Sequence, residues 1–147
     1  MWGFLIAMIS GALMSVQGVF NTAVTKSTSI WVSGAFVQLT AFLTCIIMWF
    51  FSGKPSFAGL FQVENKYTLL GGVIGAFITY TVVKSMANLG TAPAVLTIVI
   101  TQTAVAYLIE LFGLFGSTKS DFSWMKVLGL VIAIGGVVLF NMSGQKN

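Results

Sequence analysis

Two polar side chains lie inside the long apolar stretch from Thr91 to Gly113, where lipid would offer them no partner. They are the amide of Gln102 and the carboxylate of Glu110. Together with Ala106 they recur at four-residue steps, which places them on one side of a helix. A polar face on a membrane-spanning helix is expected to lie against protein or a water-filled cavity. An amide there can contact a polar solute, and a carboxylate can take up a proton or another cation.

Glu110 has two interpretations. The functional one is a site that couples transport to a proton or another cation, because ionisable residues within membrane spans usually serve a function. The other is a carboxylate that reaches the membrane surface, because Glu110 lies late in its expected helix. The sequence leaves both interpretations open.

Other apolar runs carry polar side chains at helical spacing. In the first run, Ser10, Met14, Gln17 and Asn21 form a stripe beside Gly11 and Gly18, which would let another helix come close. A small and polar face with Gln38 follows in the second run, and Tyr80 aligns with Lys84 in the third. The candidate substrate-binding or coupling residues are Gln17, Asn21, Gln38, Tyr80, Lys84, Gln102 and Glu110.

These candidates also have plainer interpretations. Amides within spans often hold helices together through hydrogen bonds of about 0.6 kcal/mol each. Asn21 would equally suit the end of a helix, Tyr80 would equally suit packing between helices, and Lys84 suits an anchor at the lipid headgroups. We favour cavity lining for Gln17 and Gln102.

Composition assigns the chain to the membrane. It has 147 residues, of which 57% are hydrophobic and 7% charged, against about 25% charged in soluble domains. The net charge of +4 comes from lysines near segment ends, which suits headgroup anchoring and not nucleic-acid binding. There is no His, and the lone Cys45 gives neither a disulfide framework nor a metal cluster. Without a nucleophile and base pair in the spans, we expect no enzyme and no cofactor.

Five apolar runs are long enough for spanning helices, which take about 20 residues each. Thr91 is expected to cap the fourth helix, with Pro93 in its first turn. The expected fold is an all-α, multi-pass membrane protein forming a single transmembrane domain over residues 1–147. The expected helices cover residues 2–24, 30–51, 67–88, 91–115 and 124–141.

Small residues at helical spacing predict sites of close packing between helices. Gly71 and Gly75 form a GxxxG pattern in the third run, and Gly129, Ala133 and Gly136 form a seam on the fifth. The fifth run has no polar stripe, so we expect its seam to serve assembly. Both sets are candidates for dimer packing.

Lysines are almost evenly divided between the two sides of the membrane. Five spans place four lysines on the side of the N-terminus and three on the other, with Lys146 among the three. A membrane protein is oriented by an excess of lysine and arginine on one side of the membrane. This chain has almost no such excess, so it is expected to insert both ways. Two inverted copies would then form a ten-helix antiparallel homodimer, with substrate near the midplane. In it, Glu110 of one copy could approach Lys84 of the other.

The chain resembles the short, five-helix YdcZ-type proteins of the drug/metabolite transporter superfamily. The resemblance rests on GALMSVQGVFN in the first run, GGVIGA in the third, and Pro93 with TQTAVAYLIELFG in the fourth. It implies a half-size transporter, so that two chains equal one ten-helix, inverted-repeat protein. The family usually has Gly before the fourth-helix Gln and often Asp at the acidic position, where this chain has Thr101 and Glu110.

These observations predict a secondary transporter of a bacterial-type plasma membrane (the inner membrane). It would move a small polar or cationic metabolite by alternating access, as an antiparallel dual-topology homodimer in the lipid bilayer. A small dual-topology ion channel is the first alternative, and a structural membrane subunit without transport activity is the second. Saturable, slow flux would indicate a carrier, whereas fast dissipative flux would indicate a channel.

Overall fold

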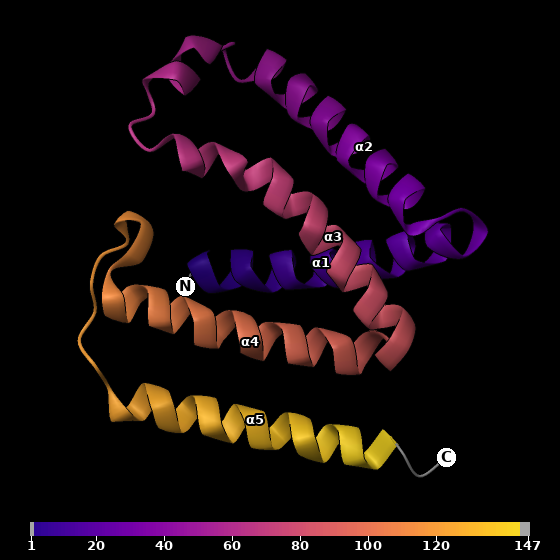
Figure 1. Ribbon diagram of the computed structural model, residues 1–147, viewed down its shortest axis with the longest axis vertical. Helices are drawn as coiled ribbons and strands as arrows, with labels where there is room; N and C mark the ends of the chain where they lie inside the picture. Colours follow the sequence, from indigo (N-terminus) through magenta and orange to yellow (C-terminus); the bar gives the residue numbers. More distant parts are fainter. Residues whose placement is uncertain (1, 145–147) are drawn as a thin grey trace. The chain divides into compact units, whose positions relative to one another are not determined.

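The computed structural model describes residues 2–144, and all its regular elements there are helices. The α-helices are α1 (Trp2–Ser27), α2 (Ile30–Phe51), α3 (Gly71–Leu89), α4 (Thr91–Phe112) and α5 (Trp124–Gly144), as Figure 1 shows. Short 3-10 helices lie in the connections: η1 (Phe57–Gln62), η2 (Lys66–Leu70) and η3 (Leu114–Gly116). Within the described range, five helices are long and apolar enough to cross a membrane, with η2 extending the third. The expectation of an all-α, five-span protein is confirmed.

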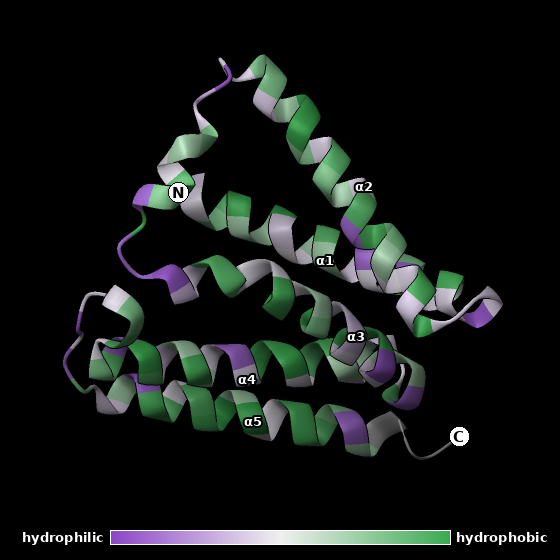
Figure 2. Cartoon of the chain, turned by 45° about the horizontal axis from the view of Figure 1, so that its top comes forward, coloured by the Kyte–Doolittle hydropathy of each residue, from purple (hydrophilic) through white to green (hydrophobic). Residues whose placement is uncertain are grey.

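Apolar residues cover the helices, and hydrophilic residues concentrate in the connections (Figure 2). Large side chains such as Trp2, Phe42 and Phe77 are exposed. Exposed apolar surface on this scale requires an apolar surrounding. Since lipid supplies that surrounding, these helices need little burial against one another.

The start of α4 differs from the sequence-based expectation. Gly90 is the N-cap, with φ 87°, and Thr91 is already the first helical residue, so no side chain caps this helix. Pro93 lies in the first turn, where its missing N–H costs no helical hydrogen bond. The predicted cap at Thr91 is therefore wrong, while the expected helix start is correct.

The end of α4 also differs. The helix ends at Phe112, not at Phe115, because Gly113 adopts the left-handed conformation with φ 63° and ψ 37°. The Gly113 N–H bonds back to the carbonyl oxygens of Ile109 and Glu110, which closes the last turn. Phe115 instead lies in η3, with φ 55°.

The chain forms two compact units, which divide after Ala87. In the first unit, α1 and α2 are joined by a short turn, where Ser29 caps α2 by accepting a hydrogen bond from the Val32 N–H. The buried Ser33 hydroxyl donates to the Asn21 carbonyl oxygen at 3.0 Å. This bond ties the start of α2 to the last turns of α1.

Helix α1 also lies against α3. A Cβ atom added at Gly18 would overlap the buried side chain of Met86, with Sδ at 2.7 Å. The hydroxyl oxygen of Thr22 lies 3.9 Å from the same sulfur. The expectation that Gly18 permits close helix packing is confirmed, whereas Gly11 has open space around it.

In the second unit, α4 and α5 run side by side (Figure 1). Their connection folds back over the end of α4. Ser120 donates its N–H to the Glu110 carbonyl oxygen at 2.9 Å, and the Ser117 hydroxyl donates to the Ile109 carbonyl oxygen at 3.2 Å. These bonds give the last carbonyl groups of α4 a second donor beside the Gly113 N–H.

Candidate functional site

Three of the four residues in the predicted stripe on α1, all but Ser10, line a hollow between α1 and α2. The cavity has a volume of about 610 Å³, and Met14, Gln17 and Asn21 contribute to its α1 wall. Leu13, Val16 and Phe20 complete that wall, and α2 supplies Val37, Thr40, Ala41, Thr44 and Cys45. Its polar groups are uncharged amides and hydroxyls, together with the Cys45 thiol. They can exchange hydrogen bonds with a polar solute, and the apolar remainder suits its hydrocarbon part.

Asn21 occupies the interior of α1, not its end. The residue is 8% exposed, and α1 continues to Ser27. Its carbonyl oxygen accepts hydrogen bonds from the hydroxyls of Thr25 and Ser33. The alternative that Asn21 caps the helix is therefore wrong.

Thr40 and Thr44 were missed by the sequence-based candidate set. Their hydroxyls bond to carbonyl oxygens of their own helix, at 3.0 Å and 2.8 Å respectively. With Val37, they repeat at three- and four-residue steps and so share one face of α2. That spacing is a usable signal in the sequence, but threonine is common in apolar helices, so the signal is weak.

Gln38 and Tyr80 belong to a separate hollow of about 210 Å³ between α2 and α3. The ring of Trp31 stacks on Tyr80, with centroids 5.0 Å apart and planes inclined by 23°. A Cβ atom at Gly75 would lie 3.5 Å from the Gln38 amide nitrogen. The first unit thus brings Gln38 and Tyr80 together, away from Gln17. Trp31 is a further residue that the sequence-based set did not include.

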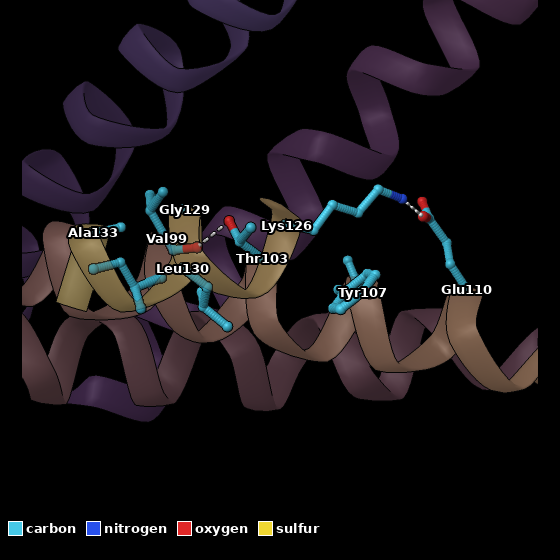
Figure 3. A pocket seen from close by; sticks show the side chains of 10 residues that line it. Val99, Thr103, Tyr107, Glu110, Lys126, Gly129, Leu130 and Ala133 are labelled. Atoms are coloured by element: carbon cyan, nitrogen blue, oxygen red, sulfur yellow. Dashed lines mark hydrogen bonds and ion pairs between the residues drawn. The ribbon is translucent and has the colours of Figure 1, made fainter. Parts of the chain in front are cut away.

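A groove runs between α4 and α5, with a volume of about 540 Å³ (Figure 3). From α4 it is lined by Val99, Ile100, Thr103, Ala106, Tyr107 and Glu110, and from α5 by Lys126, Gly129, Leu130 and Ala133. Gly129 and Ala133 thus face α4 of their own chain. Nothing lies within 4 Å of a Cβ atom placed at Gly136 or Gly71. The predicted packing against a second copy, for Gly71, Gly75, Gly129, Ala133 and Gly136, stays a prediction.

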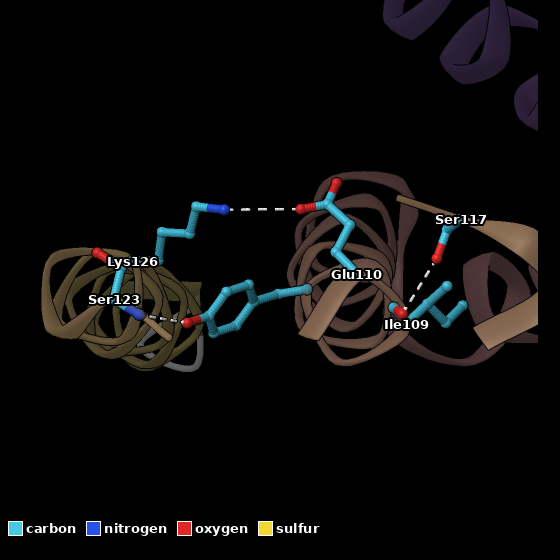
Figure 4. Close-up of polar contacts among 6 residues, drawn as sticks. Ile109, Glu110, Ser117, Ser123 and Lys126 are labelled. Atoms are coloured by element: carbon cyan, nitrogen blue, oxygen red, sulfur yellow. Dashed lines mark hydrogen bonds and ion pairs between the residues drawn. The ribbon is translucent and has the colours of Figure 1, made fainter. Parts of the chain in front are cut away.

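Glu110 has a counter-ion in its own unit. Its Oε2 lies 3.6 Å from Nζ of Lys126, and the two side chains are 52% and 49% exposed (Figure 4). Nζ also lies 5.1 Å from the centroid of the Tyr107 ring. Such an exposed pair contributes about 0.2–1 kcal/mol in water. The pair follows from the hairpin, because the end of α4 and the start of α5 lie at one depth.

Gln102 and Lys84 are exposed and lie outside the hollows described above. Ala106 and Glu110 line the groove on α4, but Gln102, expected on the same side, does not. Within the described residues, Lys84 has no ion-pair partner, and no group of three or more His, Cys, Asp and Glu residues could hold a metal ion. The roles predicted for Gln102 and Lys84 stay predictions.

The family described as "Putative inner membrane exporter, YdcZ", of the drug/metabolite transporter type, matches residues 2–139. No curated protein and no solved structure matches the chain.

Proposed function

The chain belongs to the YdcZ family of inner membrane exporters, and from this premise we propose that it is a secondary transporter of a small polar or cationic metabolite. The family and the five apolar helices make it a multi-pass protein of the inner membrane. The finer proposal is that two inverted copies form one antiparallel, ten-helix carrier that works by alternating access. The near-even division of lysines supports it.

The observation that carries the proposal is the hollow between α1 and α2. Gln17 and Asn21 are brought to one wall of about 610 Å³ of space, opposite the hydroxyl-bearing face of α2. Uncharged hydrogen-bonding groups in an apolar wall suit reversible binding, because each bond to a solute replaces a bond to water at small net gain. This favours binding and release over a chemical reaction.

Glu110 is our candidate for the coupling charge. Lys126 already neutralises it at 3.6 Å. A transported cation must therefore compete with Lys126, and a proton that neutralises Glu110 releases the lysine. Cation binding and protonation of Glu110 both change the charge at the end of the α4–α5 hairpin. This change can alter how the two helices pack and so link ion binding to helix movement.

The test is solute flux into proteoliposomes that contain the purified chain. A panel of polar and cationic metabolites is supplied, and substrate-driven proton movement is read with an internal pH dye. Gln17→Leu should lower the saturable rate about tenfold, the equivalent of about 1.4 kcal/mol of lost solute binding. Thr81→Val is the matched control, because Thr81 is exposed on α3 and lines none of the described hollows. Its rate should stay within about twofold of wild type.

The outcomes separate the alternatives. An equal loss of transport rate in Gln17→Leu and Thr81→Val would show that the hollow takes no part in transport. Fast flux that does not saturate would indicate an ion channel, and no flux with any solute would favour a structural subunit.

A further inference from the structure

The groove between α4 and α5 has a charged end and an apolar length. Lys126 and Glu110 lie at the end where α4 finishes and α5 begins. Beyond Thr103, the lining away from this end is apolar and includes Val99, Leu130 and Ala133. Figure 3 shows Lys126 reaching over Tyr107 toward Glu110, with Leu130 and Ala133 farther along the groove.

The length of the groove matches one leaflet of a bilayer. Val99 and Glu110 are eleven residues apart on α4, which is about 16 Å at the helical rise of 1.5 Å per residue. Half of the bilayer's hydrocarbon core is about 15 Å. The groove therefore reaches from the level of the charged pair to about the bilayer midplane.

Aromatic side chains place the charged end at the headgroup level. Trp124, the first residue of α5, is 76% exposed and meets Phe122 edge to face at 5.2 Å. Exposed tryptophan at the end of a span is typical of the membrane interface. Tyr107 lies beside Lys126 and is held by the Ser123 N–H, which donates to its hydroxyl at 2.9 Å.

We propose that this groove binds one ethanolamine phospholipid of the surrounding membrane, with an acyl chain along α4 and α5 and the headgroup at Lys126 and Glu110. The headgroup carries a phosphate and an ammonium group, which complement the lysine and the carboxylate. The phosphate takes Lys126 as a point-charge partner. The ammonium then replaces Lys126 as the counter-ion of Glu110 and donates N–H bonds to it. A glycerol headgroup has no ammonium, and a choline headgroup has no N–H donor.

Gly129 keeps the groove open. It lies between the charged end and the apolar length, and nothing stands within 4 Å of a Cβ atom placed there. A leucine at this position would occupy the space of the acyl chain without displacing any residue in contact. Gly135 has the same open surroundings on the same helix and does not line the groove, so it provides a matched control.

The experiment measures lipid retained by the full chain. The protein is reconstituted in vesicles of equal parts phosphatidylethanolamine and phosphatidylglycerol and extracted in mild detergent. Retained phospholipid is counted by native mass spectrometry. Wild type and Gly135→Leu should each retain about one phosphatidylethanolamine per chain. Gly129→Leu should retain at least fivefold less, and Glu110→Gln should lose the preference for phosphatidylethanolamine, because it removes the carboxylate that binds the ammonium group.

Three results would overturn the inference. The first is equal retention by Gly129→Leu and Gly135→Leu. The second is a preference of the wild type for phosphatidylglycerol, which would indicate a simple basic patch. The third is cross-linking between copies through Ala133→Cys in a Cys45→Ser background, which would show that a second chain fills the groove. Circular dichroism confirms that each variant keeps its helices. None of these readouts requires the chain to transport a solute.

Discussion

At the scale of single residues, Gly18 is where α1 lies against the side chain of Met86. We expect Gly18→Leu to lower the free energy of unfolding by about 1–3 kcal/mol, because the new side chain overfills occupied space. Gly11→Leu, on the same helix in open surroundings, should change it by less than about 0.5 kcal/mol. Thermal unfolding in detergent compares the two. Equal losses in the two variants would show that contact with Met86 does not govern the effect.

The two glycines also show what single residues reveal in a sequence. Their seven-residue spacing marked both as places where a helix could approach, but spacing cannot tell which one has a neighbour. The same limit applies to Gln102 and Glu110: the helical period placed both on one side, yet only Glu110 lines the groove. A predicted face of a helix covers a wide arc, and packing selects part of it.

At the scale of elements, the helices were predictable because lipid demands long apolar runs. All five helices start within a few residues of the expected positions, counting η2 with α3. The end of α4 differs from the predicted end at Phe115, because Leu114 and Phe115 are as apolar as the helix before them. A backbone feature, the left-handed Gly113, stops the helix there. Hydropathy carries no information about such a stop, whereas glycine after an apolar run does.

The α4–α5 hairpin determines which lysine pairs with Glu110. We expect Glu110→Lys to impair proton-coupled flux and Lys126→Glu in the same chain to restore at least half of it, because the two charges lie 3.6 Å apart within one unit. The flux assay in proteoliposomes measures this recovery. The matched comparison combines Glu110→Lys with Lys84→Glu. If Lys84→Glu restores the flux of Glu110→Lys and Lys126→Glu does not, the pair lies between inverted copies.

At the scale of the whole molecule, the membrane replaces most of the hydrophobic core. Very few large side chains are buried, and many are exposed along every span. In water this surface would aggregate, but in lipid it costs nothing, so the chain retains open hollows along its helices. Helix positions could be derived from the sequence alone because the apolar interior of the bilayer requires long apolar runs. The lining of the hollows could not, because it depends on a few contacts such as Gly18 with Met86 and Trp31 with Tyr80.

Orientation in the membrane is the property of the whole molecule on which the antiparallel dimer depends. Lys54, Lys66, Lys119 and Lys126 oppose Lys26, Lys84 and Lys146, the last of which lies outside the described residues. With four against three, we expect reporters fused to the C-terminus to be found on both sides of the membrane in comparable amounts.

Replacing Gln62 and Asn65 by lysine, in the connection between α2 and α3, should turn most chains so that this connection faces the cytoplasm. The same replacements should abolish flux when this variant is the only form present, and flux should return when an oppositely biased variant, with Ser27 and Thr28 replaced by lysine, is co-expressed. A reporter found on one side only in the unmodified chain, or full flux from a single fixed orientation, would contradict the antiparallel arrangement.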